Sequence, residues 1–322
     1  MRSAALDRRW LLDGELAESL PDCIAVAWSG GIDSTALLLL LHELGFHVQA
    51  WHVDHAWHEA SAADADMLRC RATSWDIPFY SRRLSTVTMS NREAHARHGR
   101  YLAFQSIANQ TKVYDVALAH HGDDQAETVC MRMLQGSGVM GLRGMQSQSA
   151  IHGLRLYRPL LHVRRHALLL ALQQAGIPWL EDRSNRDLQL WRNRIRLQLL
   201  PAMQAEGVEP YQLWTRWQRQ AKRIADLVEA GIASVDIKKT ADECFVEWGV
   251  WRDLQQPMRV QVLQRMAGML LGKGTVLGRR HLELVECWRK KGGRSGVDLS
   301  GCRLYRLCEG LHLQARAAIS RP

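Results

Sequence analysis

The chain lacks several features that would assign it to common classes of protein. It has no C-x-x-C pair, and its seven cysteines are an odd number. Disulfide frameworks and cysteine zinc sites use paired cysteines, so the sequence argues against both and favours reduced thiols. No apolar run reaches the roughly 18 residues of a membrane-spanning helix, and the N-terminus has no apolar signal segment. These absences predict a cytoplasmic protein that does not enter a membrane.

The loop after the first apolar segment lacks two common nucleotide-binding patterns. It contains neither G-x-x-x-x-G-K-[ST] nor G-x-G-x-x-G, which argues against a P-loop NTPase and against a dinucleotide site there. What it does contain is Ser29-Gly30-Gly31-Ile32-Asp33-Ser34-Thr35, between apolar residues 23–28 and 36–41. The pattern predicts a strand, a glycine turn and a helix. Glycines, hydroxyls and free N–H groups at a helix start suit a phosphate cradle, although an incidental tight turn would share the glycines.

Length and charge set the expected organisation. A chain of 322 residues exceeds what one hydrophobic core usually serves, so we expect two domains. The formal charge is +9, from 42 basic and 33 acidic residues, and twelve tryptophans accompany it. A basic protein of this kind often has a polyanionic partner, and exposed tryptophans can stack on bases. Nucleic acid is therefore an expected partner.

The N-terminal half alternates predicted strands and helices. Strands are predicted over residues 23–28, 47–53 and 114–119, and helices over residues 60–75 and 92–109. This alternation is typical of an α/β protein with a doubly wound parallel sheet. Ligands of such sheets bind beyond the carboxyl ends of the strands, which is where the glycine turn falls.

Two further polar segments follow predicted strands. Asp54 comes directly after the second strand, where it could simply cap a loop. The strand that ends at Ala119 is followed by H-H-G-D-D-Q-A-E-T, residues 120–128. Asp124 and Glu127 share one helix face at i, i+3, but an acidic first helix turn also forms without any chemistry. A histidine–carboxylate metal site fits poorly, because Mg²⁺ prefers oxygen ligands and zinc favours tighter N/S ligation.

Together these motifs resemble a known family. The S-G-G-x-D-S-T loop is similar to the PP-loop of ATP pyrophosphatases, and H-H-x-D-D-Q-A-E-T resembles the second signature of the tRNA(Ile)-lysidine synthetases. Five further segments resemble that family in the same order, so that the similarity spans residues 29–201. They are Glu93-Ala94-His95-Ala96-Arg97 with Arg100-Tyr101; Gly136-Ser137-Gly138 with Gly141-Leu142; Arg158-Pro159-Leu160-Leu161, as a strand; Glu181-Asp182 with Ser184-Asn185; and Arg192-Asn193 with Arg196 and Pro201.

The resemblance implies a Rossmann-like PP-loop fold and a specific reaction. ATP would adenylate the wobble cytidine in the CAU anticodon of tRNA(Ile), and the ε-amine of L-lysine would then displace AMP to give lysidine. ATP would bind at Ser29, Gly30, Gly31, Ile32, Asp33 and Ser34, and Asp33 is the natural ligand for Mg²⁺. Asp124 and Glu127 would recognise lysine, and the main chain near Val53 would receive the adenine.

Arg97 and Arg192 are the candidates to meet phosphate or developing negative charge. Each could instead belong to a structural ion pair. Taken together, the expected catalytic residues are Asp33, Asp124, Glu127, Arg97 and Arg192.

We expect a PP-loop catalytic domain over residues 1–203 and a smaller, mostly helical tRNA-binding domain over residues 204–322. Residues 209–231, 255–271 and 279–291 are predicted helices, and residues 303–306 and 311–313 a hairpin. Arginines and lysines here, among them Arg289, Lys290 and Lys291, suit phosphate contacts but would also suit a solvated helix face. The sequence stops at Pro322, before the further C-terminal domain of some family members, so we expect a reduced or differently organised grip on the tRNA acceptor end.

Three further expectations stay open. The family resemblance suggests a homodimer. The protein could be another PP-loop tRNA-modifying enzyme, although a thiolase usually needs paired cysteines and an amidotransferase needs a glutaminase domain. It could also be a non-catalytic tRNA-binding protein of the same fold, against which the intact Asp33, Asp124 and Glu127 argue.

Overall fold

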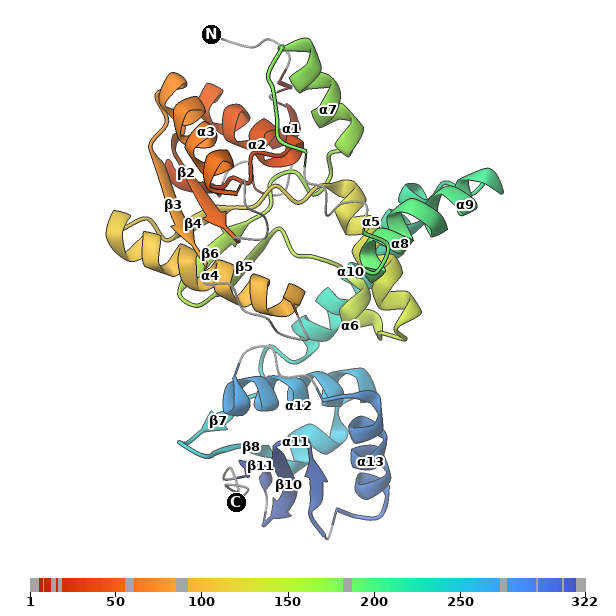
Figure 1. The fold of residues 1–322 in the computed structure, drawn as a ribbon. Helices are drawn as coiled ribbons and strands as arrows, with labels where there is room; N and C mark the ends of the chain where they lie inside the picture. The colour runs from red at the N-terminus through yellow and green to blue at the C-terminus, as the bar shows by residue number, and fades with distance from the viewer. Residues whose placement is uncertain are drawn as a thin grey trace. The chain divides into compact units, whose positions relative to one another are not determined.

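The computed structural model describes residues 6–7, 9–12, 16, 19–55, 61–84, 92–181, 187–272, 277–293, 295–308 and 310–316. The chain divides into two compact units, residues 1–220 and 221–322, whose elements are labelled in Figure 1. None of the helices within the described ranges has the length and apolarity that crossing a bilayer requires.

The first unit is built on a six-stranded sheet with the order β3-β2-β1-β4-β6-β5. Its strands are β1 (Cys23–Ala27), β2 (His47–Asp54), β3 (Phe79–Arg83), β4 (Asp115–Ala117), β5 (Gln148–Ile151) and β6 (Leu154–Tyr157). All neighbouring pairs are parallel except β5 with β6. The predicted doubly wound parallel sheet is confirmed. The winding direction reverses between β1 and β4, which is where such sheets bind ligands.

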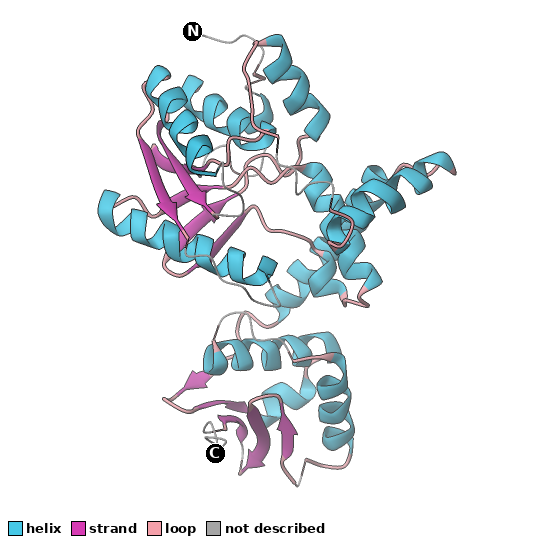
Figure 2. Cartoon of the chain, viewed as in Figure 1, coloured by secondary structure: helices cyan, strands magenta, loops and turns pink. Residues whose placement is uncertain are grey.

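Helices cover both faces of this sheet (Figures 1 and 2). The helices that begin in the first unit are α1 (Arg9–Leu12), α2 (Ile32–Glu43), α3 (Ser61–Ser74), α4 (Arg92–Thr111), α5 (Gly122–Leu134), α6 (Val139–Leu142), α7 (Arg165–Gln174), α8 (Trp191–Arg194), the π-helix η2 (Ile195–Leu199), α9 (Leu200–Ala205) and α10 (Pro210–Gly231). Alternation along β1 feeds two cores: Ile24 and Val26 pack with residues of α2, α3 and α7, and Ala25 packs with residues of α4.

The turn between β1 and α2 is held firmly at both ends. The leucines at positions 37–41 of α2 are at most 6% exposed, so burial on all sides fixes this helix against the sheet. At the strand end, the indole Nε1 of Trp28 donates a hydrogen bond to Thr35 Oγ1 at 3.0 Å. Gly30, with φ +82°, makes the turn between them.

Some sequence predictions for this unit were incomplete or wrong. The short strands β3 and β5 were not predicted. Residues 158–161 form a turn rather than the expected strand, because β6 ends at Tyr157 and Pro159 has no N–H to donate.

The boundary between the units also differs from the predicted one at residues 203/204. It falls inside α10, after Gln220. The reason is that Tyr211 and Trp214, in the first half of this helix, pack with α5 and η2 in the first unit.

The second unit contains a five-stranded antiparallel sheet, β7-β8-β11-β10-β9, beside helices. Its elements are β7 (Lys238–Lys239), β8 (Glu243–Glu247), α11 (Trp248–Asp253), α12 (Gln256–Leu271), α13 (Arg279–Lys290), β9 (Val297–Leu299), β10 (Cys302–Leu307) and β11 (Gly310–Ala315). The predicted helices and the β10–β11 hairpin are present, but the sheet is larger than the hairpin alone. Alternate residues such as Val246, Leu304 and Leu313 form one core with Trp251 and Met266 from the helices.

The glycine turn generates a testable prediction about stability. A Cβ on Gly30 would lie 2.7 Å from Leu68 and 2.8 Å from Leu180, whereas one on Gly45, at φ +90°, would meet nothing within 4 Å. Gly45→Ala should therefore report backbone strain alone, and Gly30→Ala should lose a further 1–3 kcal/mol, approximately, of unfolding free energy through overpacking. Urea denaturation of the two variants tests this, and equal losses would contradict the close approach at Gly30.

Candidate active site

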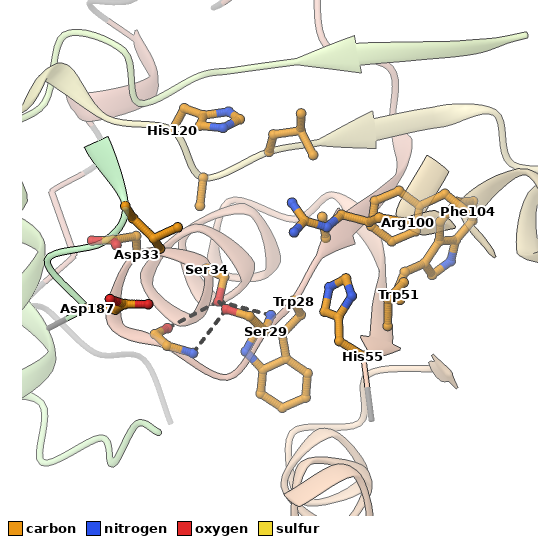
Figure 3. Close-up of a pocket in the computed structure, with 16 residues that line it drawn as sticks. Trp28, Ser29, Asp33, Ser34, Trp51, His55, Arg100, Phe104, His120 and Asp187 are labelled. Carbon is orange, nitrogen blue, oxygen red and sulfur yellow. Dashed lines mark hydrogen bonds between the residues drawn. The ribbon is translucent and has the colours of Figure 1, made fainter. Parts of the chain in front are cut away.

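The turn after β1 forms an open cradle (Figure 3). The Ser29 and Ser34 hydroxyls lie 3.1 Å apart, and the Ser34 hydroxyl donates to the carbonyl oxygen of Gly31 at 3.2 Å. Gly31 is the N-cap of α2, and no side chain caps that helix. The first N–H groups of a helix have no intrahelical partners, and with the helix dipole they favour an anion.

A pocket of about 530 Å³ opens in front of this cradle. Ser29, Gly31, Asp33 and Ser34 line one part of it. Aromatic and basic side chains line another part (Figure 3): Trp51 of β2, His55 directly after β2, and Arg100 and Phe104 from the middle of α4. A pocket with a polar cradle at one side and rings at the other matches a nucleotide, whose phosphates and base differ in the same way.

The acidic turn lies directly beside the cradle. β4 pairs with β1, so the segment after β4 comes out next to the segment after β1. There His121 is the N-cap of α5 and forms a capping box with Asp124, with hydrogen bonds of 3.1 and 3.2 Å. Its buried Nε2 lies 3.3 Å from Asp124 Oδ2 and 3.7 Å from Asp33 Oδ2. His121 thus lies between the predicted phosphate cradle and the predicted lysine-binding residues.

Two arginines bind Asp124 and Glu127, the carboxylates predicted to recognise lysine. Arg192 donates to Glu127 Oε2 at 2.7 Å and to Asp124 Oδ1 at 3.0 Å. Arg196 donates to Glu127 Oε1 at 2.6 Å and to Asp124 Oδ1 at 3.3 Å. Glu127 is 1% exposed, so its charge depends on these partners. Arg192 was a candidate either to meet phosphate or to form a structural ion pair. The structure shows the ion pair.

The backbone around these arginines is irregular. Arg192 lies on α8, while Arg196 lies on the π-helix η2, the one π-helical stretch within the described residues. Such stretches often occur at functional sites. Here the widened turn accompanies two arginines, four positions apart, that both reach α5. Sequence reasoning missed Arg196, although the R-N-x-x-R spacing was visible.

The other predicted arginine lies elsewhere. Arg97 is exposed on α4, with its guanidinium 5.2 Å from the ring centroid of Tyr101. Arg100, one turn further along the helix, lines the pocket instead. Asp187 and Leu190 also line the pocket and were not predicted. Asp182, Ser184 and Asn185, of the E-D-x-S-N segment, lie outside the described residues.

The buried charges shift one another's proton affinities. Burial raises the pKa of Asp33, against the opposing effect of His121 and Arg165. Burial would also raise the pKa of Asp124, but His121 and Arg192 hold it below its ordinary value. Burial lowers the pKa of His120 to about 4. At neutral pH the imidazole of His120, which lines the pocket, is therefore neutral, and Asp124 is ionised.

Asp33 has the properties that a nucleotide-borne Mg²⁺ would need. Its Oδ1 is buried and has no hydrogen-bond partner. Over the described ranges no three His, Cys, Asp or Glu residues form a metal cluster. A complete protein cage is not required, because Mg²⁺ usually binds one or two carboxylates together with water and phosphate oxygens.

Comparisons with known proteins find similarity over most of the first unit. A family model described as a PP-loop domain matches residues 12–203. A tRNA(Ile)-lysidine synthase of Pseudomonas aeruginosa is 33% identical over 75% of this chain and 55% of its own length. One of Chlamydia caviae is 34% identical over 55% of this chain and 56% of its own length. The chain thus spans little more than half the length of these curated relatives.

A solved structure shows the same fold. The U34-tRNA thiolase NcsA from Methanococcus maripaludis superposes with a TM-score of 0.54 over 67% of this chain and 77% of its own. The two sequences are only 15% identical, so this likeness concerns the fold alone.

The ion-pair cluster predicts a particular pattern of stabilities. Arg196→Met leaves buried Glu127 with one arginine instead of two and should lower the unfolding free energy by about 1–3 kcal/mol. Glu127→Gln in the same chain should recover part of that loss, because the neutral amide needs less compensation. Chemical denaturation of both single variants and the double variant measures this coupling. Strict additivity would contradict a direct interaction.

His120 predicts a dependence of stability on pH. Because its pKa falls from 6.5 to about 4 on folding, only the unfolded chain takes up this proton between those values. The unfolding free energy should therefore fall as pH drops from 6.5 to 4. His120→Gln should lose that part of the acid sensitivity, whereas His166→Gln, at an exposed histidine, should keep it. Identical pH profiles for the wild type and His120→Gln would refute the buried neutral imidazole.

Proposed function

The chain belongs to the PP-loop family, and from that premise we propose that it ligates lysine to the wobble cytidine of the CAU anticodon of tRNA(Ile). The reaction consumes ATP and gives lysidine, AMP and pyrophosphate. One observation carries this proposal: His121 lies 3.7 Å from Asp33 of the phosphate cradle and 3.3 Å from Asp124 of the acidic turn. The proposed phosphate site and the proposed site for the lysine cation thus adjoin at His121. The curated relatives carry this activity in their names.

The first step uses the cradle. The triphosphate of ATP binds at the N–H groups and hydroxyls of residues 29–34, and the adenine lies toward Trp51 and Phe104. Asp33 would hold Mg²⁺, which would supply positive charge to the phosphates. The cytosine carbonyl oxygen attacks the α-phosphorus while the bond to the β-phosphate oxygen breaks. Pyrophosphate leaves, and the base remains joined to AMP.

The second step uses the acidic turn. Asp124 and Glu127 bind the lysine side chain, and its ε-ammonium must lose a proton before the amine attacks the adenylated carbon. The new carbon–nitrogen bond forms as AMP departs. Arg192 and Arg196 hold both carboxylates in place. The start of α5 therefore keeps its structure when the lysine ammonium binds. The role proposed for Arg97 stays a prediction.

The second unit supplies cations suited to tRNA phosphates. Lys290 and Lys291, at the end of α13, are exposed, whereas Arg289 is half-buried and bonded to Glu286 at 3.1 Å. In the first unit, Trp217 on α10 is 49% exposed. We propose that Lys290, Lys291 and Trp217 position the tRNA backbone without reading its bases. A homodimer and a cytoplasmic location remain predictions from the sequence.

The reaction is tested by incubating the protein with tRNA(Ile) bearing a CAU anticodon, ATP, Mg²⁺ and labelled lysine. Label retained in the tRNA, together with AMP, supports the proposal. Asp33→Asn should lower the rate of AMP formation at least 100-fold while tRNA affinity changes by less than threefold, because only the nucleotide step uses this carboxylate. A preparation that binds ATP and tRNA but incorporates no lysine would refute the function.

Asp124 and Glu127 predict a separable effect on lysine. Glu127→Gln should raise the lysine concentration needed for half-maximal rate by about 10-fold or more, since it weakens a buried charge-assisted contact. The KM for ATP should stay within about threefold. Steady-state kinetics with varied lysine and ATP measure both values. An unchanged lysine requirement would exclude Glu127 from the lysine site.

The exposed lysines predict a change in salt dependence. Each phosphate contact adds about 0.9 to the slope of log affinity against log salt concentration for duplexes. Replacing Lys290 and Lys291 by glutamine should lower that slope by about 1–2. The matched control replaces Arg279 and Arg280, two exposed cations at the opposite end of α13. Equal slopes in both variants and the wild type would show that Lys290 and Lys291 belong to a solvated surface and do not contact tRNA phosphates.

A further inference from the structure

We propose that Arg165 is the cation that binds the β- and γ-phosphates of ATP and then the pyrophosphate released from it. This inference rests on the proposed function and deepens it, because it assigns a leaving-group contact that the family motifs do not indicate. Arg165 is the first residue of α7, which follows the turn at residues 158–161. It lies outside every motif in which the sequence suggested a phosphate-binding arginine.

A bound triphosphate needs positive charge around it. The glycine loop has no lysine of the Walker type, so the negative charge of a triphosphate must be met by residues from other segments. Arg192 and Arg196 are bound to Glu127 and Asp124, where removing them would leave a buried carboxylate short of partners. The two arginines therefore serve the acidic turn and are poorly placed to serve the phosphates as well.

Arg165 contacts the cradle at Asp33. Its guanidinium Nε lies 3.5 Å from Oδ1 of Asp33, and Asp33 lines the pocket beside Ser34. The backbone N–H of Arg165 donates to Asp123 Oδ2 at 2.8 Å, which fixes the base of the side chain to the start of α5. The head group thus approaches the phosphate end of the pocket from an anchored backbone.

The contact with Asp33 leaves the guanidinium available. At 3.5 Å it is an ion pair without a hydrogen bond, since Asp33 Oδ1 has no hydrogen-bond partner. The Arg165 side chain is 43% exposed, so it can turn toward a ligand at low cost in free energy. A planar guanidinium can then donate two parallel hydrogen bonds to phosphate oxygens.

The neighbouring arginine provides a contrast. Arg164 donates from Nε to Asp123 Oδ1 at 3.0 Å, and its guanidinium lies 4.1 Å from the ring centroid of Tyr211. Two adjacent arginines therefore point to different partners. Arg164 ties α7 to α5 and α10, while Arg165 faces the cradle. The pair offers a charge-matched comparison on one helix turn.

The role of Arg165 in the reaction is that of a binding and leaving-group residue. When the cytosine oxygen bonds to the α-phosphorus, the bridging oxygen keeps the electron pair of the broken bond, and charge grows on pyrophosphate. A guanidinium near the outer phosphates stabilises that charge. AMP lacks both outer phosphates, so Arg165 should contribute little to its affinity.

The experiment measures equilibrium binding of ATP, inorganic pyrophosphate and AMP, each with Mg²⁺, to the full-length wild type, Arg165→Gln, Arg165→Lys and Arg164→Gln. Arg165→Gln should weaken ATP and pyrophosphate binding 10- to 100-fold, approximately, the range for loss of a charge-assisted contact, with AMP binding within twofold. Arg165→Lys should recover part of the pyrophosphate affinity. Arg164→Gln should stay within twofold of the wild type for all three ligands.

Each remaining outcome counts against the inference. Pyrophosphate affinity within twofold of the wild type in Arg165→Gln would overturn it and leave the proposed function intact. An equal loss for AMP, or an equal effect of Arg164→Gln, would show that α7 acts only through the local structure. A wild-type protein that binds neither ATP nor pyrophosphate would overturn this inference and the proposed function together.

Discussion

The half-buried carboxylates at the reversal point of the sheet are the constraint on which the site depends. Asp33 follows β1 and Asp124 follows β4, and the two strands are neighbours in the sheet. Their side chains converge on His121, which is 1% exposed. Carboxylates in such surroundings must be paired or remain protonated. The cations that satisfy them therefore decide which ligands the pocket can accept.

Three cationic side chains share this task, and they divide it by location. Arg192 and Arg196 lie against Glu127 and Asp124, while Arg165 lies against Asp33. In the proposed reaction, Arg192 and Arg196 would balance the turn that receives the lysine ammonium. Arg165 would adjoin the cradle that receives the phosphates. In the proposed site, the lysine cation and the phosphate anion therefore bind on adjoining sides of His121. This arrangement matches a reaction that joins an amine to a phosphate-activated base.

Much of the fold could be predicted because its signals are local. The strand, glycine turn and leucine helix around Asp33 follow from residues next to one another, and so does the shared face of Asp124 and Glu127. The partners of those carboxylates could not be predicted in the same way. Arg196 meets Glu127 across 69 positions of sequence, and Arg165 reaches Asp33 from another helix. Such pairings depend on how segments pack, which periodicity does not reveal.

The same distinction explains the errors in the rest of the chain. β3 and β5 are short strands at the two edges of the first sheet, and edge strands carry a weak apolar pattern. The boundary between the compact units lies beyond the predicted domain boundary at residues 203/204, because Tyr211 and Trp214 pack with α5 and η2. Burial of an aromatic ring is decided by its neighbours in space, which composition does not reveal.

The proposed reaction requires that nucleotide and lysine bind side by side, on adjoining sides of His121. A crystal structure of the protein with Mg²⁺, a non-hydrolysable ATP analogue and lysine tests this most directly. We predict the phosphates at residues 29–34 and the lysine ammonium within hydrogen-bond distance of Asp124 or Glu127. Lysine bound away from both carboxylates, or a nucleotide bound outside the glycine turn, would contradict the account.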